Sequence, residues 1–161
     1  MQVLRDNQPS NSAKRSVVTI GAYDGVHRGH QAVIGQVRKE AQQLGCQSVV
    51  VTFDKHPASV VRPESAPKLL TDLDQKLELL QQTGIDATLI VEFNRERSTE
   101  DPALFVKRVL VDTLRAQVVV VGEDFHFGFN RGGNVAMLRE LGKQFDFQVE
   151  PVKLIARPDG V

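Results

Sequence analysis

Two short, almost wholly apolar runs constrain the fold of this 161-residue chain more than any other feature: SVVVTF at 48–53 and QVVVVG at 117–122. A strand with one face in water alternates apolar and polar residues, whereas these runs are apolar at nearly every position. Both faces of each strand must therefore be buried, which is typical of a parallel sheet covered by helices. Further strand-like runs occupy 16–21, 86–93 and 147–154.

Helical patterns, in which apolar residues recur at spacings of three and four, lie between these runs over 30–44, 71–84, 98–114 and 133–145. Gly45 and Gly84 mark the ends of the first two helices. Thr71 and Asp74 form a capping-box pattern at the start of the second helix. Pro102 belongs in the first turn of the third helix.

Strand and helix thus alternate along the chain, and right-handed crossovers build such a pattern into a Rossmann-like, doubly wound α/β domain. We expect a parallel sheet of about five strands with helices on both faces, formed by residues 16–161. The polar residues 1–15 are expected to form an N-terminal arm or a leading strand. The length of the chain suits one domain.

Composition and charge exclude several classes of function. The 20 basic and 20 acidic side chains cancel, so no overall field attracts nucleic acid or an anionic membrane. A single cysteine, Cys46, excludes an internal disulfide and a thiolate metal cluster. No apolar run approaches the roughly 20 residues of a membrane span. We therefore expect a cytoplasmic protein that binds small molecules.

Nearly all of the unusual polar, glycine-rich or histidine-bearing segments of the chain follow strands. GAYDGVHRGH follows the first strand, DKHP the second, NRERS the third and GEDFHFGFNRGG the fourth. The carboxyl ends of parallel strands meet at one edge of the sheet, where α/β domains bind their ligands. The four segments together predict a ligand site at that edge.

The first of these segments suits a phosphate group. His27 and His30 are three residues apart, so a helix presents both on one face of its first turn. Free amides and the helix dipole make that end of the helix positive. Gly21 and Gly29 allow a ligand to approach the backbone closely, and Asp24 suits a turn or a helix cap.

Such a site favours attack on the α-phosphate of a nucleoside triphosphate, because positioned donors stabilise the charge that builds on the phosphoryl oxygens. Alternatives exist for the histidines. A pair at this spacing can bind zinc, but no third ligand at a known spacing accompanies it. A histidine near a helix start can also be an ordinary surface residue. The position of HRGH between an apolar strand and a helix favours the phosphate site.

Three strings of the sequence resemble a known family. HRGH matches the HxGH motif of the nucleotidyltransferase superfamily. Together, GAYDGVHRGH, TFDKHP (52–57) and VGEDFHFG (121–128) resemble the adenylyltransferase module of the bacterial bifunctional riboflavin kinase/FMN adenylyltransferases, the FAD synthetases. The strings occur in the order of that family, and the resemblance extends from about residue 16 to the last residue.

The resemblance implies transfer of an adenylyl group from ATP to FMN, giving FAD and pyrophosphate, with Mg²⁺. His27 and His30 would hold the ATP phosphates and stabilise the transferred group. The residues that would line the nucleotide are Gly21, Ala22, Tyr23, Asp24 and Gly29. The residues that would form the flavin side are His56, Pro57, Phe105, Asp124 and Phe127. In the loop NRGGN, Arg131 is a candidate phosphate contact.

The flavin-side residues also have structural interpretations. An isoalloxazine ring needs aromatic or proline faces, and Phe125, Phe127 and Phe129 alternate after the fourth strand. These rings can equally pack in the core. His56, which precedes Pro57, can be a turn residue.

The chain departs from the family pattern in three places. Ala22-Tyr23 stands where Asn-Phe is usual, and Lys55 where Pro is usual. After ARPDGV (156–161), relatives continue with a Ser/Thr-rich segment and a riboflavin kinase module, which these residues do not include. We therefore do not assign riboflavin phosphorylation to them. The alternatives are an HxGH nucleotidyltransferase with another acceptor, such as pantetheine phosphate or nicotinamide mononucleotide, and a non-catalytic binder of flavin or nucleotide.

Overall fold

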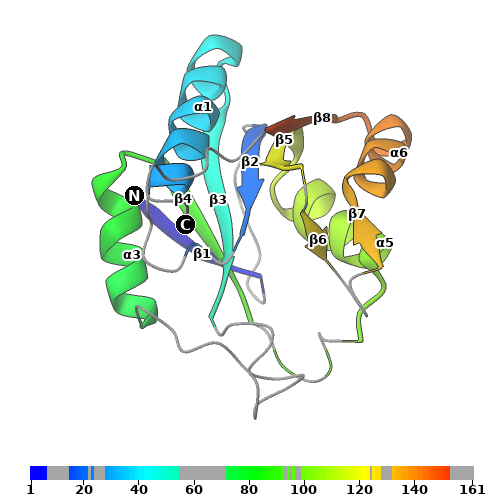
Figure 1. Cartoon of the computed structure of the whole chain (residues 1–161), viewed down its shortest axis with the longest axis horizontal. Helices are drawn as coiled ribbons and strands as arrows, with labels where there is room; N and C mark the ends of the chain where they lie inside the picture. Colours follow the sequence, from blue (N-terminus) through cyan, green and yellow to red (C-terminus); the bar gives the residue numbers. More distant parts are fainter. Residues whose placement is uncertain are drawn as a thin grey trace, which may run out of the picture.

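The computed structural model describes residues 1–6, 15–21, 23, 28–54, 72–92, 94, 96, 99–123, 125–127 and 132–152. At its centre is a six-stranded sheet of order β1-β4-β3-β2-β5-β8, in which all neighbouring strands are parallel (Figure 1). The strands are β1 (Gln2–Arg5), β2 (Ser16–Ile20), β3 (Gln47–Phe53), β4 (Ala87–Val91), β5 (Ala116–Gly122) and β8 (Gln148–Val152). The predicted α/β class and parallel sheet are confirmed.

The strand order reverses between β2 and β5. From β2 the chain adds β3 and β4 on one side, and it then returns to add β5 and β8 on the other. A doubly wound sheet binds its ligands at such a switch point. GAYDGVHRGH and GEDFHFGFNRGG follow the two strands that flank it. The sheet has one strand more than the expected five. This strand is β1, which pairs with β4 at the outer edge of the sheet.

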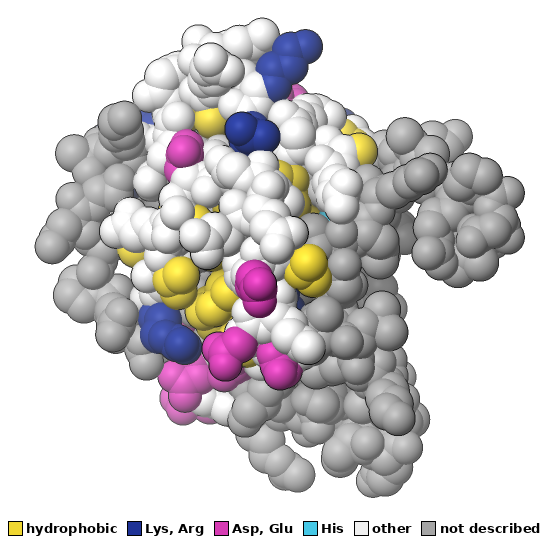
Figure 2. Space-filling view, turned by 90° about the vertical axis from the view of Figure 1, so that its left-hand side faces the viewer, with side chains coloured by type: hydrophobic (Ala, Val, Ile, Leu, Met, Phe, Trp, Pro, Cys, Tyr) yellow, Lys and Arg dark blue, Asp and Glu magenta, His cyan; other side chains and the backbone are white. Residues whose placement is uncertain are grey.

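Helices cover both faces of the sheet, as the sequence predicts. One face carries α1 (Arg28–Leu44) and α3 (Leu73–Gln82). The other carries α5 (Pro102–Phe105), the π-helix η2 (Val106–Thr113) and α6 (Val135–Phe145). Figure 2 looks onto the side of α1 and α3, where hydrophobic side chains show in small groups among polar ones. Within the described residues, no helix combines the length and apolar character needed to cross a membrane.

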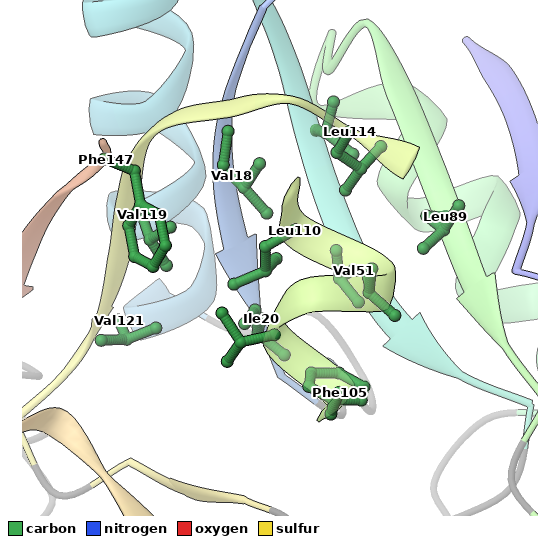
Figure 3. Packing of buried hydrophobic residues seen from close by; sticks show 14 of the residues in the cluster. Val18, Ile20, Val51, Leu89, Phe105, Leu110, Leu114, Val119, Val121 and Phe147 are labelled. Atoms are coloured by element: carbon green, nitrogen blue, oxygen red, sulfur yellow. The ribbon is translucent and has the colours of Figure 1, made fainter. Parts of the chain in front are cut away.

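The alternation of side chains along the strands produces a core on each face of the sheet. In β2, Val18 and Ile20 pack with η2 and α6, whereas Val17 packs with α1. The side chains of Val17, Val18 and Ile20 are each at most 5% exposed, so the strand is buried on both faces. Figure 3 shows the first core, in which Leu110 lies between labelled residues of the sheet such as Val18 and Val51.

The start of α3 differs from the prediction by one residue. The capping box is formed by Asp72 and Gln75 instead of Thr71 and Asp74. Asp72 Oδ1 accepts a hydrogen bond from Gln75 N at 2.8 Å, and Asp72 N donates to Gln75 Oε1 at 3.0 Å. Both pairs have the same spacing, and Asp with Gln satisfies the helix start as well as Thr with an acidic residue. Thr71 lies outside the described residues.

The third helix begins at 102 instead of 98, with Pro102 in its first turn as predicted. Asp101 caps it by accepting a hydrogen bond from Ala103 N at 2.8 Å. A residue that precedes proline avoids helical geometry, which explains the later start. From Val106 the helix widens into η2, in which Leu114 N donates to Val109 O at 3.1 Å across five residues. The regular apolar spacing gave no signal of this widening.

Removal of a side chain from the first core should destabilise the fold strongly. Leu110 is fully buried, so Leu110→Ala is expected to lower the free energy of unfolding by about 2–5 kcal/mol, because a cavity remains. Leu104 is 62% exposed one turn and a half earlier in the same helical segment, and Leu104→Ala is the matched control. Urea denaturation of both variants measures the difference. Equal losses would contradict the described packing.

Two carboxyl groups meet where α1 lies against β8. Burial, together with a hydrogen bond to Glu150 and the charge of Glu150, raises the pKa of Glu40 from its ordinary 4.5 to about 7; a hydrogen bond with Gln36 acts in the opposite direction. Gln36 Nε2 also donates to Glu150 Oε2 at 3.2 Å. Glu40 therefore keeps its proton at mildly acid pH, and its carboxylate is repelled by the charge of Glu150 once it ionises.

This pair should make stability depend on pH. Because the pKa of Glu40 is higher in the folded state, its stabilising effect is complete below its ordinary pKa and is lost as the pH rises to about 7. Glu40→Gln should therefore flatten the fall in melting temperature between about pH 5 and about pH 8. Glu78→Gln, at an exposed site on α3, is the control and should keep the wild-type profile. An unchanged profile in Glu40→Gln would contradict the interaction.

Candidate active site

The carboxyl end of β2 holds the first group of predicted site residues. Gly21 directly follows β2, and its N–H donates to Val51 O at 3.0 Å. A Cβ atom at Gly21 would lie 2.9 Å from Cε2 of Tyr23, closer than side chains tolerate. Glycine at this position therefore makes room for the ring of Tyr23.

Tyr23, two residues after Gly21, is held in place by a residue of β2. Its backbone has φ of 50°, in the left-handed region, and its side chain is only 4% exposed. The hydroxyl forms a 2.7 Å hydrogen bond with Thr19 Oγ1, another buried group. Burial raises the pKa of Tyr23 to about 12, while the bond to Thr19 acts against that rise. The phenol therefore stays neutral, and its ring belongs to the core beneath α1.

His30 lies in the first turn of α1, as the sequence predicts. The helix begins at Arg28, and His30 is half-buried. Its ring centroid lies 4.6 Å from that of Tyr23, with the planes inclined at 51°. The orientation of this imidazole is therefore restricted by an aromatic ring that is itself locked by Thr19. Gly29 lies in the same turn.

The described residues include only part of the predicted flavin side. Phe105 is buried at the end of α5 and belongs to the first core cluster, where Figure 3 shows it beyond Ile20. The guanidinium of Arg108 lies 6.0 Å from the centroid of its ring. Phe125 packs partly buried against the same cluster. Phe127 is in β6 (His126–Phe127), which pairs antiparallel with β7 (Gly133–Asn134).

Several predicted site residues lie outside the described residues, and their assignments stay predictions. They are Ala22, Asp24, His27, His56, Pro57, Asp124 and Arg131.

Lys76 is a residue of this edge that the sequence analysis missed. It lies on α3, is only 8% exposed, and its Nζ donates to Phe53 O at 3.1 Å and to Thr52 Oγ1 at 3.3 Å. Its ammonium group therefore sits at the carboxyl end of β3, where TFDKHP continues. Its spacing could have indicated burial. Lys76 falls three residues after Leu73 and four before Leu80, so it lies on the apolar face of the helix.

A second polar cluster ties the ends of β1 and β4 to η2. Arg108 binds Glu100 through two nitrogens at 2.9 and 3.0 Å, and it binds Asp6 at 2.8 Å. Asp6 follows β1 and also accepts a hydrogen bond from Glu92 N at 3.0 Å, just after β4. Burial alone would lower the pKa of Arg108, but its bonds to Glu100 and Asp6 raise it. This cluster fixes the carboxyl ends of β1 and β4.

Metal ligands do not gather in the described part of the chain. It brings no group of three or more His, Cys, Asp and Glu side chains close enough to hold an ion. A magnesium ion that arrives with a nucleotide needs few protein ligands, because phosphates and water complete its shell.

Comparison with known proteins agrees with this arrangement. The model of the family described as FAD synthetase matches residues 9–160. The bifunctional riboflavin kinase/FMN adenylyltransferase of Pseudomonas fluorescens is 40% identical over 139 residues, which are 86% of this chain and 44% of that protein. The corresponding protein of Haemophilus influenzae is 33% identical over 93% of this chain and 49% of its own length. The chain thus spans less than half the length of these relatives.

A solved structure supports the fold. The crystal structure of a macrolide-efflux protein from Streptococcus pneumoniae superposes with a TM-score of 0.82 at 20% identity, covering 99% of this chain and 54% of its own. At that identity the likeness concerns the fold alone. The family match, which extends over nearly the whole sequence, goes further: this chain belongs to the FAD synthetase family.

Proposed function

We propose that this chain transfers an adenylyl group from ATP to FMN, giving FAD and pyrophosphate. The observation that carries the proposal is the family match over residues 9–160, which spans all three motif strings. The position of the switch point between β2 and β5 supports it, because the strands that flank it precede two of these strings. The names of the relatives agree with an FMN acceptor.

The proposed reaction is an in-line displacement at the α-phosphorus of ATP. A phosphate oxygen of FMN forms the new bond to this atom, the bond to the bridging oxygen of the β-phosphate breaks, and pyrophosphate leaves with that oxygen. The chain supplies the positive end of α1, with its free amides, and the imidazole of His30. His27 would be the second donor. These groups would stabilise the charge on the phosphoryl oxygens without a covalent intermediate.

Of the residues proposed to bind FMN, one has support from its position in the fold, and the others follow from the family resemblance. Phe105 lies near the carboxyl ends of the strands in Figure 3, and its ring is proposed to border the flavin. His56, Pro57, Asp124, Phe127 and the phosphate contact Arg131 are proposed from the family resemblance and the motif strings. Magnesium is proposed to enter with the ATP phosphates, whose negative charge it would neutralise.

The relatives are bifunctional proteins of about twice the matched length, so a riboflavin kinase module is a proposed partner of this domain. A cytoplasmic location stays a prediction. The other two interpretations are AMP transfer to a different acceptor and flavin or nucleotide binding without turnover.

One assay separates the three interpretations. We expect the purified protein, incubated with FMN, ATP and Mg²⁺, to form FAD and pyrophosphate in equal amounts, measured by chromatography and a pyrophosphate assay. Pyrophosphate release only with another acceptor would favour the second interpretation. Flavin binding, measured by fluorescence quenching, without pyrophosphate release would favour the third.

The two histidines are expected to be catalytic. His27→Ala and His30→Ala should each lower the rate of adenylyl transfer by roughly 100-fold or more, because each removes a donor to the transferred phosphoryl group. Gln43→Ala, at an exposed position near the other end of α1, should keep the wild-type rate. Circular dichroism and melting temperature check that the variants are folded. Wild-type rates in both histidine variants would remove these side chains from the mechanism.

A further inference from the structure

We propose that Lys76 is a positioning residue for the FMN side of the site, a role that rests on the proposed function. Lysine is almost never fully buried unless its ammonium group has partners. Lys76 is 8% exposed on α3, where its neighbour one turn on, Leu80, is fully buried. The cost of removing this charge from water indicates that the position has a specific use.

Two acceptors of the ammonium group among the described residues indicate that use. Phe53 is the last residue of β3, and its carbonyl oxygen accepts from Lys76 Nζ at 3.1 Å. Thr52, which is fully buried, contributes the second acceptor at 3.3 Å. Hydrogen bonds to an ionised donor are roughly twice as strong as neutral ones. The ammonium group therefore fastens the carboxyl end of β3 to α3.

The neighbouring strand holds the same end from the other side. Phe53 is in register with Val91 of β4, and Asp54 N donates to Val91 O at 3.1 Å. Lys76 and β4 thus jointly hold the end of β3 at Phe53 and Asp54. His56 and Pro57, which are proposed to touch the flavin, follow Asp54 by two and three residues. Lys76 would act on the flavin through this strand end, whereas the nucleotide side is built on β2 and α1.

If Lys76 acts only on the flavin side, its removal should affect FMN more than ATP. In Lys76→Met, which keeps the length of the side chain but removes the charge, we expect KM for FMN to rise about tenfold or more, as the loss of bonds to a charged donor would produce. KM for ATP should change by less than about twofold, because the residues at β2 and α1 are untouched. Lys39→Met, at an exposed position on α1, is the matched control and should leave both constants unchanged.

A purely structural role would move different quantities. It would lower the melting temperature and the amount of active enzyme while KM for FMN stayed at its wild-type value, and that result would overturn the proposal. An equal rise in both KM values would also overturn it. Hydrogen exchange provides a readout besides activity: the amide of Asp54 should exchange faster in Lys76→Met than in Lys39→Met.

A second variant keeps the test decisive if Lys76→Met does not fold. Thr52→Val removes one acceptor and keeps the strand carbonyl, so a smaller rise in KM for FMN alone is expected, about threefold. An unchanged KM for FMN in that variant would overturn the proposal. If the wild-type protein forms FAD and these variants keep its KM for FMN, only the role of Lys76 is contradicted. A wild-type protein that neither binds FMN nor forms FAD contradicts the proposed function, and this role with it.

Discussion

Burial of the sheet on both faces is the constraint on which the rest of the structure depends. The central strands β2, β3 and β5 have apolar side chains toward both layers of helices, so they leave little room there for chemistry. Polar groups can reach a ligand only where the strands end. The parallel arrangement brings all of these ends to the same edge, where the strand order switches between β2 and β5, and sheets of this kind bind their ligands at such a switch point. The predicted location of the site is therefore a consequence of the hydrophobic core.

The polar groups buried near that edge share one arrangement. Thr19 binds the hydroxyl of Tyr23, the carbonyl of Phe53 binds Lys76, and Asp6 binds Arg108. Each interaction joins a strand or its end to the segment or helix that faces it. The neutral bond of Tyr23 contributes only about 1 kcal/mol to stability and the bonds of Lys76 and Arg108, which are charged, contribute more, but a buried partner left unpaired would cost more than its bond contributes. Together they hold strand ends in fixed directions, which is what positioned donors and a planar acceptor require.

Much of the fold could be predicted because its signals are local. Continuous apolar runs indicated the parallel sheet, and glycine and proline indicated helix ends at Gly45, Gly84 and Pro102. The site was only partly accessible to such reasoning. Contacts between distant segments leave no local pattern, and the burial of Lys76 against β3 and the pairing of Glu40 with Glu150 are of this kind. The widening of η2 was missed for another reason: its buried residues Val106, Val109 and Leu110 recur at the spacings of three and four that also predict an ordinary α-helix.

The departure from the family pattern at Tyr23 bears on the choice between catalysis and simple binding. A tyrosine in place of the usual phenylalanine keeps the aromatic ring that lies 4.6 Å from His30. It adds a hydroxyl that would be costly to bury alone, and Thr19 supplies the partner at 2.7 Å. The substitution is thus compensated within the strand that precedes the motif, and the imidazole still meets an aromatic face. Within the described residues the exchange keeps the aromatic contact with His30, so it does not favour the non-catalytic interpretation.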